Sequence, residues 1–223
     1  SGESLAGENK HGIDFDTVVK ICEPIKKCVD AGVQVGIVVG GGNFWRGRSS
    51  GEMDRPRADQ MGMLATVINS IGLSMSIKSE GIEAEVFTST PMEPMARYYA
   101  KEKAVEVMEG GGVAIIAGGT GNPFFTTDSA SALRACEIEA DALLKGTRVD
   151  GVYTADPEKD PTATKYETLT FDKALADNLR IMDQTAFALC REGNMPIIVF
   201  DMNQKGNLTK LVKGEKVGTL VHV

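Results

Sequence analysis

Apolar residues recur along the chain with two different spacings, which predicts an alternation of helices and strands. Apolar positions three and four residues apart are typical of helices with one buried face, and short unbroken apolar runs are typical of buried strands. The helical spacing covers residues 14–30, 59–78, 94–108, 129–138 and 182–191. The apolar runs cover residues 33–39, 83–89, 113–117, 141–147 and 196–202, and we expect residues 215–223 to form a short hairpin that closes a sheet edge.

Individual residues set some of these boundaries. Asp14 is a suitable N-cap for the first helix and Gly32 a suitable stop, while Pro24 should kink that helix or split it in two. Residues 148–170 show little periodicity and are expected to form a loop. The first twelve residues resemble a loop whose preceding strand is missing.

The alternation predicts an α/β fold, a three-layer sandwich in which helices cover both faces of a mostly parallel central sheet. A chain of 223 residues can form it as a single domain, 1–223. Ligands of such sheets bind beyond the carboxyl ends of the strands. Three polar loops follow predicted strands, GGGNFWRG (40–47), GGTGNPFFTTD (118–128) and KGTRVDGVYTADP (145–157), and we expect them to gather on one edge.

The composition of the chain argues against several classes of binding partner. The formal net charge of -7 argues against a nucleic-acid partner. No apolar run reaches the roughly 18 residues of a membrane span, and the start does not resemble a signal peptide, so no membrane partner is expected. The four cysteines include no CxxC pair and no histidine cluster accompanies them, which predicts no metal site and reduced core thiols in a cytoplasmic protein.

The first loop has the composition of an anion-binding turn. Three glycines, 40–42, let backbone N–H groups approach an anion, although a tight strand-to-helix turn would use glycine too. Arg46 and Arg48 follow, and a guanidinium group can bind phosphate through two hydrogen bonds. Solvated surface arginines are the alternative.

The second loop combines an anion-binding and an aromatic feature. Thr126, Thr127 and Asp128 precede an apolar helix, so hydroxyls and helix N-terminal amides can converge on one anionic group. Phe124 and Phe125 can form an apolar wall for a base beside that group, or they can be core residues. The sequence has no GxxxxGK[ST] and no GxGxxG, which argues against a P-loop protein and a dehydrogenase.

The third polar stretch, 150–161, has two interpretations. It can be a plain surface loop with two Asp-Pro turns. It can also hold a second nucleotide, with Tyr153 against the base and Asp156 on polar groups.

Together these motifs resemble the bacterial uridylate (UMP) kinases of the amino acid kinase superfamily. The resemblance runs over essentially the whole chain, through SGESLAG, VGGGNFWRG, DQMGMLATVIN, GTGNPFFTTDSA, EADALLKGTRVDGVYTADPEKDPTA, MDQTAF and GTLV. It implies transfer of a phosphoryl group from MgATP to UMP, giving UDP and ADP in pyrimidine nucleotide synthesis. It also implies a homohexamer and a cytoplasmic, allosterically regulated enzyme.

The resemblance also assigns site residues. On the UMP side it implies Gly41, Asp59, Thr120, Gly121, Asn122, Pro123, Phe124, Phe125, Thr126 and Thr127, with Asp59 on the ribose hydroxyls. On the ATP side it implies Ser1, Gly2, Gly42, Arg46, Thr147, Tyr153 and Asp156. Asp128 and Asp183 correspond to acids implicated in catalysis, which would order a lysine or Mg²⁺ between the phosphates; Asp183 can instead be only a helix N-cap.

Two features depart from the family pattern. Family members carry a lysine just before the Ser-Gly that opens this chain, and Lys145 is not expected to replace it. Without that lysine the chain would be a catalytically impaired nucleotide-binding or storage module; a kinase of carboxylates or carbamate is a further alternative, against which the second loop and Asp59 argue. The family is typically activated by GTP and inhibited by UTP, but Lys78 is the only cation in the corresponding segments, 74–85 and the approach to residue 113.

Overall fold

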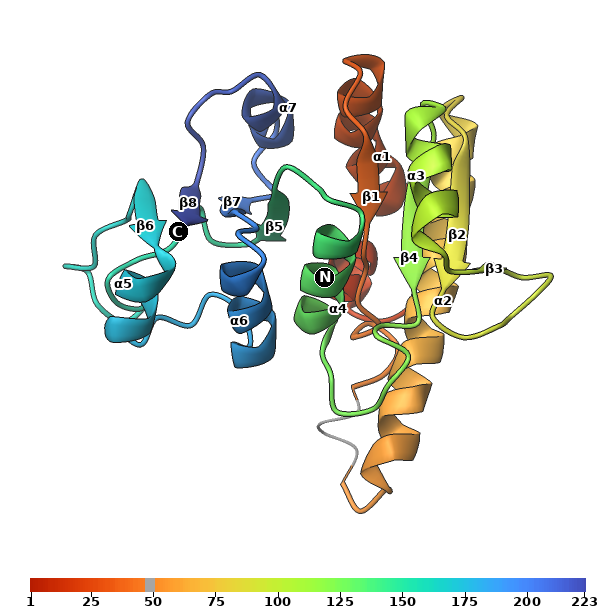
Figure 1. Ribbon diagram of the computed structural model, residues 1–223, viewed down its shortest axis with the longest axis horizontal. Coiled ribbons are helices and arrows are strands. Elements are labelled where there is room, and N and C mark those ends of the chain that lie inside the picture. Colours follow the sequence, from red (N-terminus) through yellow and green to blue (C-terminus); the bar gives the residue numbers. More distant parts are fainter. Residues whose placement is uncertain (47–50) are drawn as a thin grey trace. The chain divides into compact units, whose positions relative to one another are not determined.

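The computed structural model describes residues 1–46 and 51–223, which form two compact units, Ser1–Ala130 and Ser131–Val223 (Figure 1). In both units helices alternate with short strands, and five of the six strand pairings are parallel. The predicted α/β class with mostly parallel strands is therefore confirmed. That the chain acts as a single domain stays a prediction.

The first unit is built on a fully parallel sheet. Its strand order is β1 (Val35–Ile37), β4 (Val113–Ala117), β2 (Ala84–Thr88) and β3 (Arg97–Tyr98). All five residues of β4 are buried, although successive side chains of a strand point to opposite faces. Both faces of this sheet are therefore covered, as expected for a parallel sheet.

Three helices pack in the first unit, and a fourth leads out of it. They are α1 (Phe15–Asp30), α2 (Arg55–Ser79), α3 (Lys101–Glu109) and α4 (Thr127–Glu137), preceded by short 3₁₀ turns at Gly2–Leu5 and Gly7–Asn9. Pro24 does not split α1, because the helix runs through it as one element, and the alternative of a kink at Pro24 stays a prediction. Helix α2 begins four residues before the predicted start, where the Asp54 side chain accepts a hydrogen bond from the backbone N–H of Arg57 at 3.1 Å.

The predicted helix over 94–108 is wrong in its first half. Residues Arg97–Tyr98 form β3, which pairs with Phe87 and Thr88 of β2, and only Lys101–Glu109 is helical. Pairing with a distant strand decided this segment, and local apolar spacing does not report such pairing.

The second unit has a mixed sheet in the order β5 (Leu143–Thr147), β7 (Ile197–Asp201), β8 (Thr219–His222) and β6 (Thr168–Thr170). Its helices are α5 (Phe171–Ala176), α6 (Gln184–Glu192) and α7 (Asn207–Val212), and its core includes the edge-to-face ring pair of Phe171 and Phe187. The C-terminal hairpin was predicted wrongly. The single strand β8 lies inside the sheet, antiparallel to β7 and parallel to β6, so it closes no edge. The long loop predicted over 148–170 ends in β6, and α5 was not predicted.

Helix α2 is long and apolar enough, by length and composition alone, to cross a membrane. More than half of its most apolar window, 56%, is buried inside the fold, and core helices of soluble proteins pass the same test.

Candidate active site

Two glycine loops leave the same edge of the first sheet. Because β1 and β4 are parallel neighbours, the first glycine loop (residues 40–46) and the second glycine loop (residues 118–128) both begin at strand carboxyl ends. They touch, since a Cβ added at Gly40 would lie 3.3 Å from the Thr127 hydroxyl oxygen. The convergence predicted for these two loops is confirmed. The third polar loop belongs to the second unit, and its place on this edge stays a prediction.

Close packing explains the glycines of the first loop. A Cβ at Gly41 would lie 2.7 Å from the Cβ of Ala65 on α2, and one at Gly2 would collide with the carbonyl oxygen of Gly40. Only glycine lets the N-terminal turn and α2 approach this loop so closely. The tight-turn and anion-binding interpretations are therefore compatible at these positions.

Arg46 already has a carboxylate partner. Its guanidinium group forms an ion pair with Glu3 of the N-terminal turn, and both side chains are largely exposed. An exposed pair of this kind is weak, so an incoming phosphate can displace Glu3 at small cost. Arg48 lies outside the described residues.

Asp59 connects α2 to the second glycine loop. Its Oδ2 accepts hydrogen bonds from the backbone N–H of Phe124 and from Nε of Arg55, each at 2.8 Å. Neither contact uses Oδ1, and the side chain is 11% exposed. The carboxylate is thus fixed in place with a second oxygen for a ligand hydroxyl.

The two phenylalanines of this loop are surface residues. Phe124 is 64% exposed and Phe125 48% exposed, so the interpretation that they belong to the core is wrong. Phe124 has a φ of +73°, in the left-handed region that a bulky side chain rarely adopts, and the Arg55 guanidinium lies 5.6 Å from its ring centroid. A loop that holds an exposed aromatic ring in an unfavourable backbone conformation is typical of binding sites.

A threonine hydroxyl bonds to the first turn of the helix that follows the phenylalanines, and the predicted convergence of hydroxyls and amides on an anion stays a prediction. The Thr126 hydroxyl oxygen accepts a hydrogen bond from the backbone N–H of Ser129 at 3.3 Å, and Asp128 lies in the first turn of α4. Thr120 and Asn122 bond to each other within the turn that precedes the rings.

Sequence reasoning missed two hydroxyls that hold the second glycine loop. Thr66 of α2 accepts a hydrogen bond from the backbone N–H of Gly118 at 2.8 Å, and Ser89 donates one to the carbonyl of Gly119 at 2.6 Å. A usable signal existed for Thr66, because it lies seven residues after Asp59 and so on the same face of α2.

In the second unit, Tyr153 is held by an acid. Its hydroxyl donates to Oδ1 of Asp150 at 2.6 Å, and Lys165 pairs with the same carboxylate at 2.9 Å. The hydrogen bond from Tyr153, aided by Lys165, lowers the pKa of Asp150, and the carboxylate raises the pKa of Tyr153. Asp156 pairs with Lys159 at 3.1 Å, and the hydrogen bond from Lys159 lowers the pKa of Asp156.

Asp183 and Lys145 lie on neighbouring parts of the second unit. Asp183 is the N-cap of α6, where its Oδ1 accepts from the backbone N–H of Ala186 at 2.9 Å. Lys145 of β5 donates to the carbonyl of Ile181 at 2.8 Å, two residues before Asp183. Thr147 ends β5, and its hydroxyl donates to the carbonyl of Val149 at 2.7 Å. The predicted cap is confirmed, and a catalytic role for Asp183 stays a prediction.

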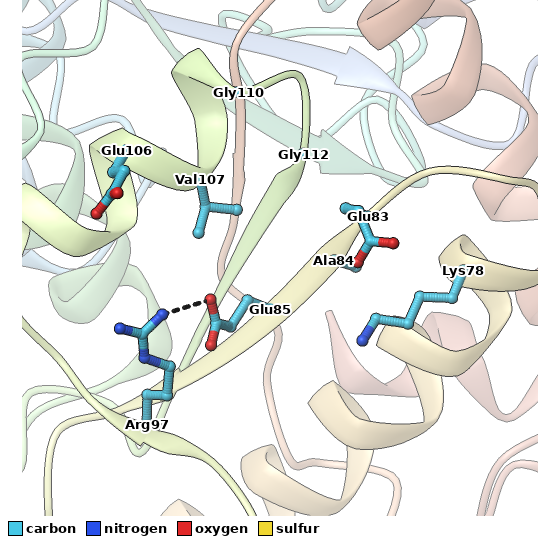
Figure 2. Close-up of a pocket in the computed structure, with 9 residues that line it drawn as sticks. All are labelled: Lys78, Glu83, Ala84, Glu85, Arg97, Glu106, Val107, Gly110 and Gly112. Atoms are coloured by element: carbon cyan, nitrogen blue, oxygen red, sulfur yellow. Dashed lines mark hydrogen bonds and ion pairs between the residues drawn. The ribbon is translucent and has the colours of Figure 1, made fainter.

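A pocket of about 490 Å³ lies elsewhere in the first unit (Figure 2). It covers the region where the family resemblance implies GTP regulation, and it contains Lys78. Arg97 adds a cation that those sequence segments did not show, but it pairs with Glu85 at 2.8 Å. Glu83 and Glu106 also line the pocket, so its carboxylates outnumber its cations.

Within residues 1–46 and 51–223, no group of three or more His, Cys, Asp or Glu side chains is arranged to hold a metal ion. Magnesium commonly binds proteins through one or two carboxylates and the phosphates of a substrate. The described residues therefore fit an ion carried by a nucleotide and not one held in a cage of protein ligands.

Comparison with known proteins extends these observations. The chain matches the amino acid kinase family over residues 1–201. It is 57% identical to a uridylate kinase of Phocaeicola vulgatus over 224 residues, which cover 100% of this chain and 95% of that protein. It is 54% identical to a uridylate kinase of Porphyromonas gingivalis over 223 residues, 99% of this chain and 93% of that one.

Solved structures of similar fold are also UMP kinases. The UMP kinase of Bacillus anthracis has a TM-score of 0.96 with 37% identity, over 99% of this chain and 92% of that chain. The UMP kinase of Ureaplasma parvum has a TM-score of 0.93 with 37% identity, over 100% of this chain and 95% of that chain. The chain therefore belongs to the amino acid kinase family and groups within it with the uridylate kinases.

Proposed function

We propose that this protein is a UMP kinase, which transfers the γ-phosphoryl group of ATP to UMP and releases UDP and ADP. The observation that carries the proposal is the meeting of two glycine loops at one sheet edge, beside a fixed carboxylate and two exposed rings. Such an edge offers backbone donors for phosphate, an acid for ribose and a surface for a flat base. The relatives at 54–57% identity are named uridylate kinases.

Both substrates contact the first glycine loop, and UMP also contacts the second. UMP lies on the first unit, with its phosphate at Gly41 and at the hydroxyls of Thr126 and Thr127, its ribose at Asp59, and its base by the ring of Phe124. The further UMP contacts are Thr120, Gly121, Asn122, Pro123 and Phe125. The ATP contacts are Ser1, Gly2, Gly42, Arg46, Thr147, Tyr153 and Asp156. The proximity of Gly40 to Thr127 supports this arrangement, because the two loops approach each other next to the residues that we propose for phosphate binding.

The reaction requires positioning more than covalent chemistry. A phosphate oxygen of UMP attacks the γ-phosphorus as the bond from that phosphorus to the ADP oxygen breaks, with the two oxygens in line. Glycine-loop N–H groups and Arg46 bind the phosphates and offset their charge. Magnesium, bound with ATP, would supply further positive charge at the phosphates. Asp128 and Asp183 act in the chemical step by ordering cationic groups there.

We extend the proposal to the whole chain. Residues 1–223 act as one amino acid kinase domain, since the family match runs across the boundary between the two units. The enzyme works in the cytoplasm in pyrimidine nucleotide synthesis, which suits its four cysteines, all described and none in a disulfide. It assembles as a homohexamer, for which the apolar exposed face of α2 provides a contact surface.

A coupled assay that measures ADP formation from MgATP tests the function. We expect UMP to be the preferred acceptor over CMP, GMP and dUMP. Loss of the ribose 2′-hydroxyl removes the ligand partner of one Asp59 carboxylate oxygen, which costs about 1–3 kcal/mol. The value of kcat/KM for dUMP should therefore be lower than that for UMP by roughly tenfold or more. The Asp59→Asn variant should reduce the preference for UMP over dUMP.

Three results would change the assignment. Equal kcat/KM for UMP and dUMP in the parent enzyme would exclude the ribose role of Asp59. Turnover of another acceptor but not of UMP would overturn the UMP kinase proposal. UMP binding without turnover in the full-length protein would favour the nucleotide-binding or storage module.

A further inference from the structure

Two asparagine side chains are buried together beneath the first glycine loop. Asn43 is 1% exposed and Asn69 of α2 is 0% exposed. Each side chain amide donates to the other: Nδ2 of Asn43 lies 2.9 Å from Oδ1 of Asn69, and Nδ2 of Asn69 lies 2.7 Å from Oδ1 of Asn43.

The remaining donors of this pair bind backbone carbonyls. Asn43 donates to the carbonyl of Gly12, and Asn69 donates to the carbonyl of Gly40, both at 2.7 Å. Both NH₂ groups are thereby fully used. The pair joins the N-terminal segment, the first glycine loop and α2, and such a complete buried network fixes one geometry.

The bond to Gly40 determines where the loop presents its donors. A peptide unit is planar and trans, so the carbonyl of Gly40 and the N–H of Gly41 point in opposite directions. Because Asn69 holds that carbonyl toward α2, the N–H of Gly41 faces away from the helix. That is the orientation a phosphate-binding amide needs.

Asn69 also shares its helix with both anchors of the second glycine loop. Asp59 binds the backbone N–H of Phe124, and Thr66 binds that of Gly118. At 3.6 residues per turn, the three side chains lie within about 80° of arc on α2. One helix face therefore holds both loops.

We propose that Asn69 is a positioning residue that acts through Asn43 and the carbonyl of Gly40, orienting the first glycine loop for phosphate relative to the second. The link to phosphate rests on the proposed function. Asn69 touches neither substrate, so its loss misplaces the phosphates without removing a contact with them, and misplacement reduces the rate of transfer.

The test replaces Asn69→Asp, which keeps the shape of the side chain but sets a carboxylate oxygen against two acceptors. Ser76→Ala is the matched control, since Ser76 is buried on the same helix and bonds only within it, to the carbonyl of Gly72 at 3.3 Å. The first readout is hydrogen–deuterium exchange of a peptide covering residues 40–46 in the ligand-free protein. The second is kcat and KM for UMP and ATP, normalised to the folded fraction.

We expect exchange of that peptide to become about tenfold faster in Asn69→Asp, and kcat/KM for UMP to fall about tenfold or more, mainly through kcat. Ser76→Ala should leave both readouts at parent values. If Asn69→Asp does not fold, Asn69→Ser, which keeps one donor, replaces it with the same readouts.

Parent values of exchange and of kcat/KM in the Asn69 variant would overturn the inference, even if thermal stability were reduced. A parent enzyme that binds but does not phosphorylate UMP would instead overturn the proposed function. The exchange measurement would still decide whether Asn69 positions the loop.

Discussion

At the residue scale, two carboxylates that we propose for the site also make structural hydrogen bonds. Asp59 fixes the second glycine loop through Oδ2, and neither of its two contacts there uses Oδ1. Asp183 caps α6 through Oδ1. A substitution at such a residue changes folding and chemistry together unless it is chosen to separate them.

The substitution Asp183→Asn separates the effect on folding from the effect on chemistry. The amide oxygen of asparagine can still accept the hydrogen bond from the backbone N–H of Ala186, so the cap and the thermal stability should persist. The lost charge should reduce kcat about a hundredfold if it supplies about 2.7 kcal/mol in the transition state. KM for UMP should change little. Steady-state kinetics and a thermal melt of the full-length variant measure both.

The matched control is Thr170→Ala, which removes the N-cap of α5 in the same unit. It should lower stability by about 1 kcal/mol and leave kcat unchanged. Near-normal kcat in Asp183→Asn, or a loss of activity that follows unfolding, would show that Asp183 is a structural cap only.

Sequence could predict part of the candidate site at this scale. Glycines, threonines and acids after apolar runs indicated the two loops, and Asp59 and Asp183 were found through the family resemblance. Asn69 could not be found in this way, because its partners lie 26 and 29 residues away and a polar residue in an apolar helix does not reveal them. Thr66 differs, because its place seven residues after Asp59 puts it on the same face of α2, although its partner Gly118 lies 52 residues away.

At the element scale, the apolar spacing of α2 predicts a helix but does not show which of its faces is buried. One face carries Asp59, Thr66 and Asn69 toward the loops, while another exposes an apolar stripe of Met61, Leu64, Ile68 and Met75. A helix with a polar face turned inward and an apolar face exposed reverses the usual pattern for a surface helix. Sequence predicted its existence but not which face is buried.

Strand pairing limited the rest of the fold prediction. Strand β4 was predicted with its observed bounds because a run of five buried residues needs no partner to be recognised. Strand β3 has two residues and is defined by its pairing with β2, and β8 is defined by β7 and β6 on its two sides. These contacts join segments distant in sequence, so local spacing could not predict them.

The pocket between β2, β3 and α3 leads to a prediction about regulation. Its carboxylates Glu83, Glu85 and Glu106 outnumber Lys78 and Arg97, and Glu85 already binds Arg97 (Figure 2). A triphosphate would meet net negative charge there. We expect GTP to change kcat and KM less than about twofold, and to bind more tightly to Glu85→Gln, in which Arg97 loses its carboxylate partner.

Isothermal titration with GTP and kinetics at several GTP concentrations measure this. Glu102→Gln, on the first turn of α3 and not among the pocket residues, is the charge-matched control and should resemble the parent. Strong activation of the parent enzyme by GTP would show that the pocket charge does not govern the response.

At the scale of the whole molecule, we expect the exposed apolar stripe of α2 to be covered by another protein chain. The exposed side chains of Phe15 and Val19 on α1 extend this surface. Helix α1 packs against α2, and the Phe15 ring lies close to Gly72 of α2. Monomeric proteins seldom expose contiguous apolar surface of this kind, and a second copy of the same face can cover it by two-fold symmetry.

We therefore expect Leu64→Glu with Ile68→Glu to dissociate the assembly, because two carboxylates on each facing stripe would be buried without partners. Mass measured by sedimentation at micromolar concentration should fall from a multiple of the 23.8 kDa chain to smaller species. Leu175→Glu is the matched control: Leu175 is an exposed leucine on α5 of the second unit and no part of the stripe, and its replacement should leave the mass unchanged. The substituted positions face away from the polar side of α2, so dissociated protein that still binds UMP would show that the stripe serves assembly and not the site. A parent protein with the mass of a single chain would reject the assembly, and an intact assembly in the double variant would place the contact on another surface.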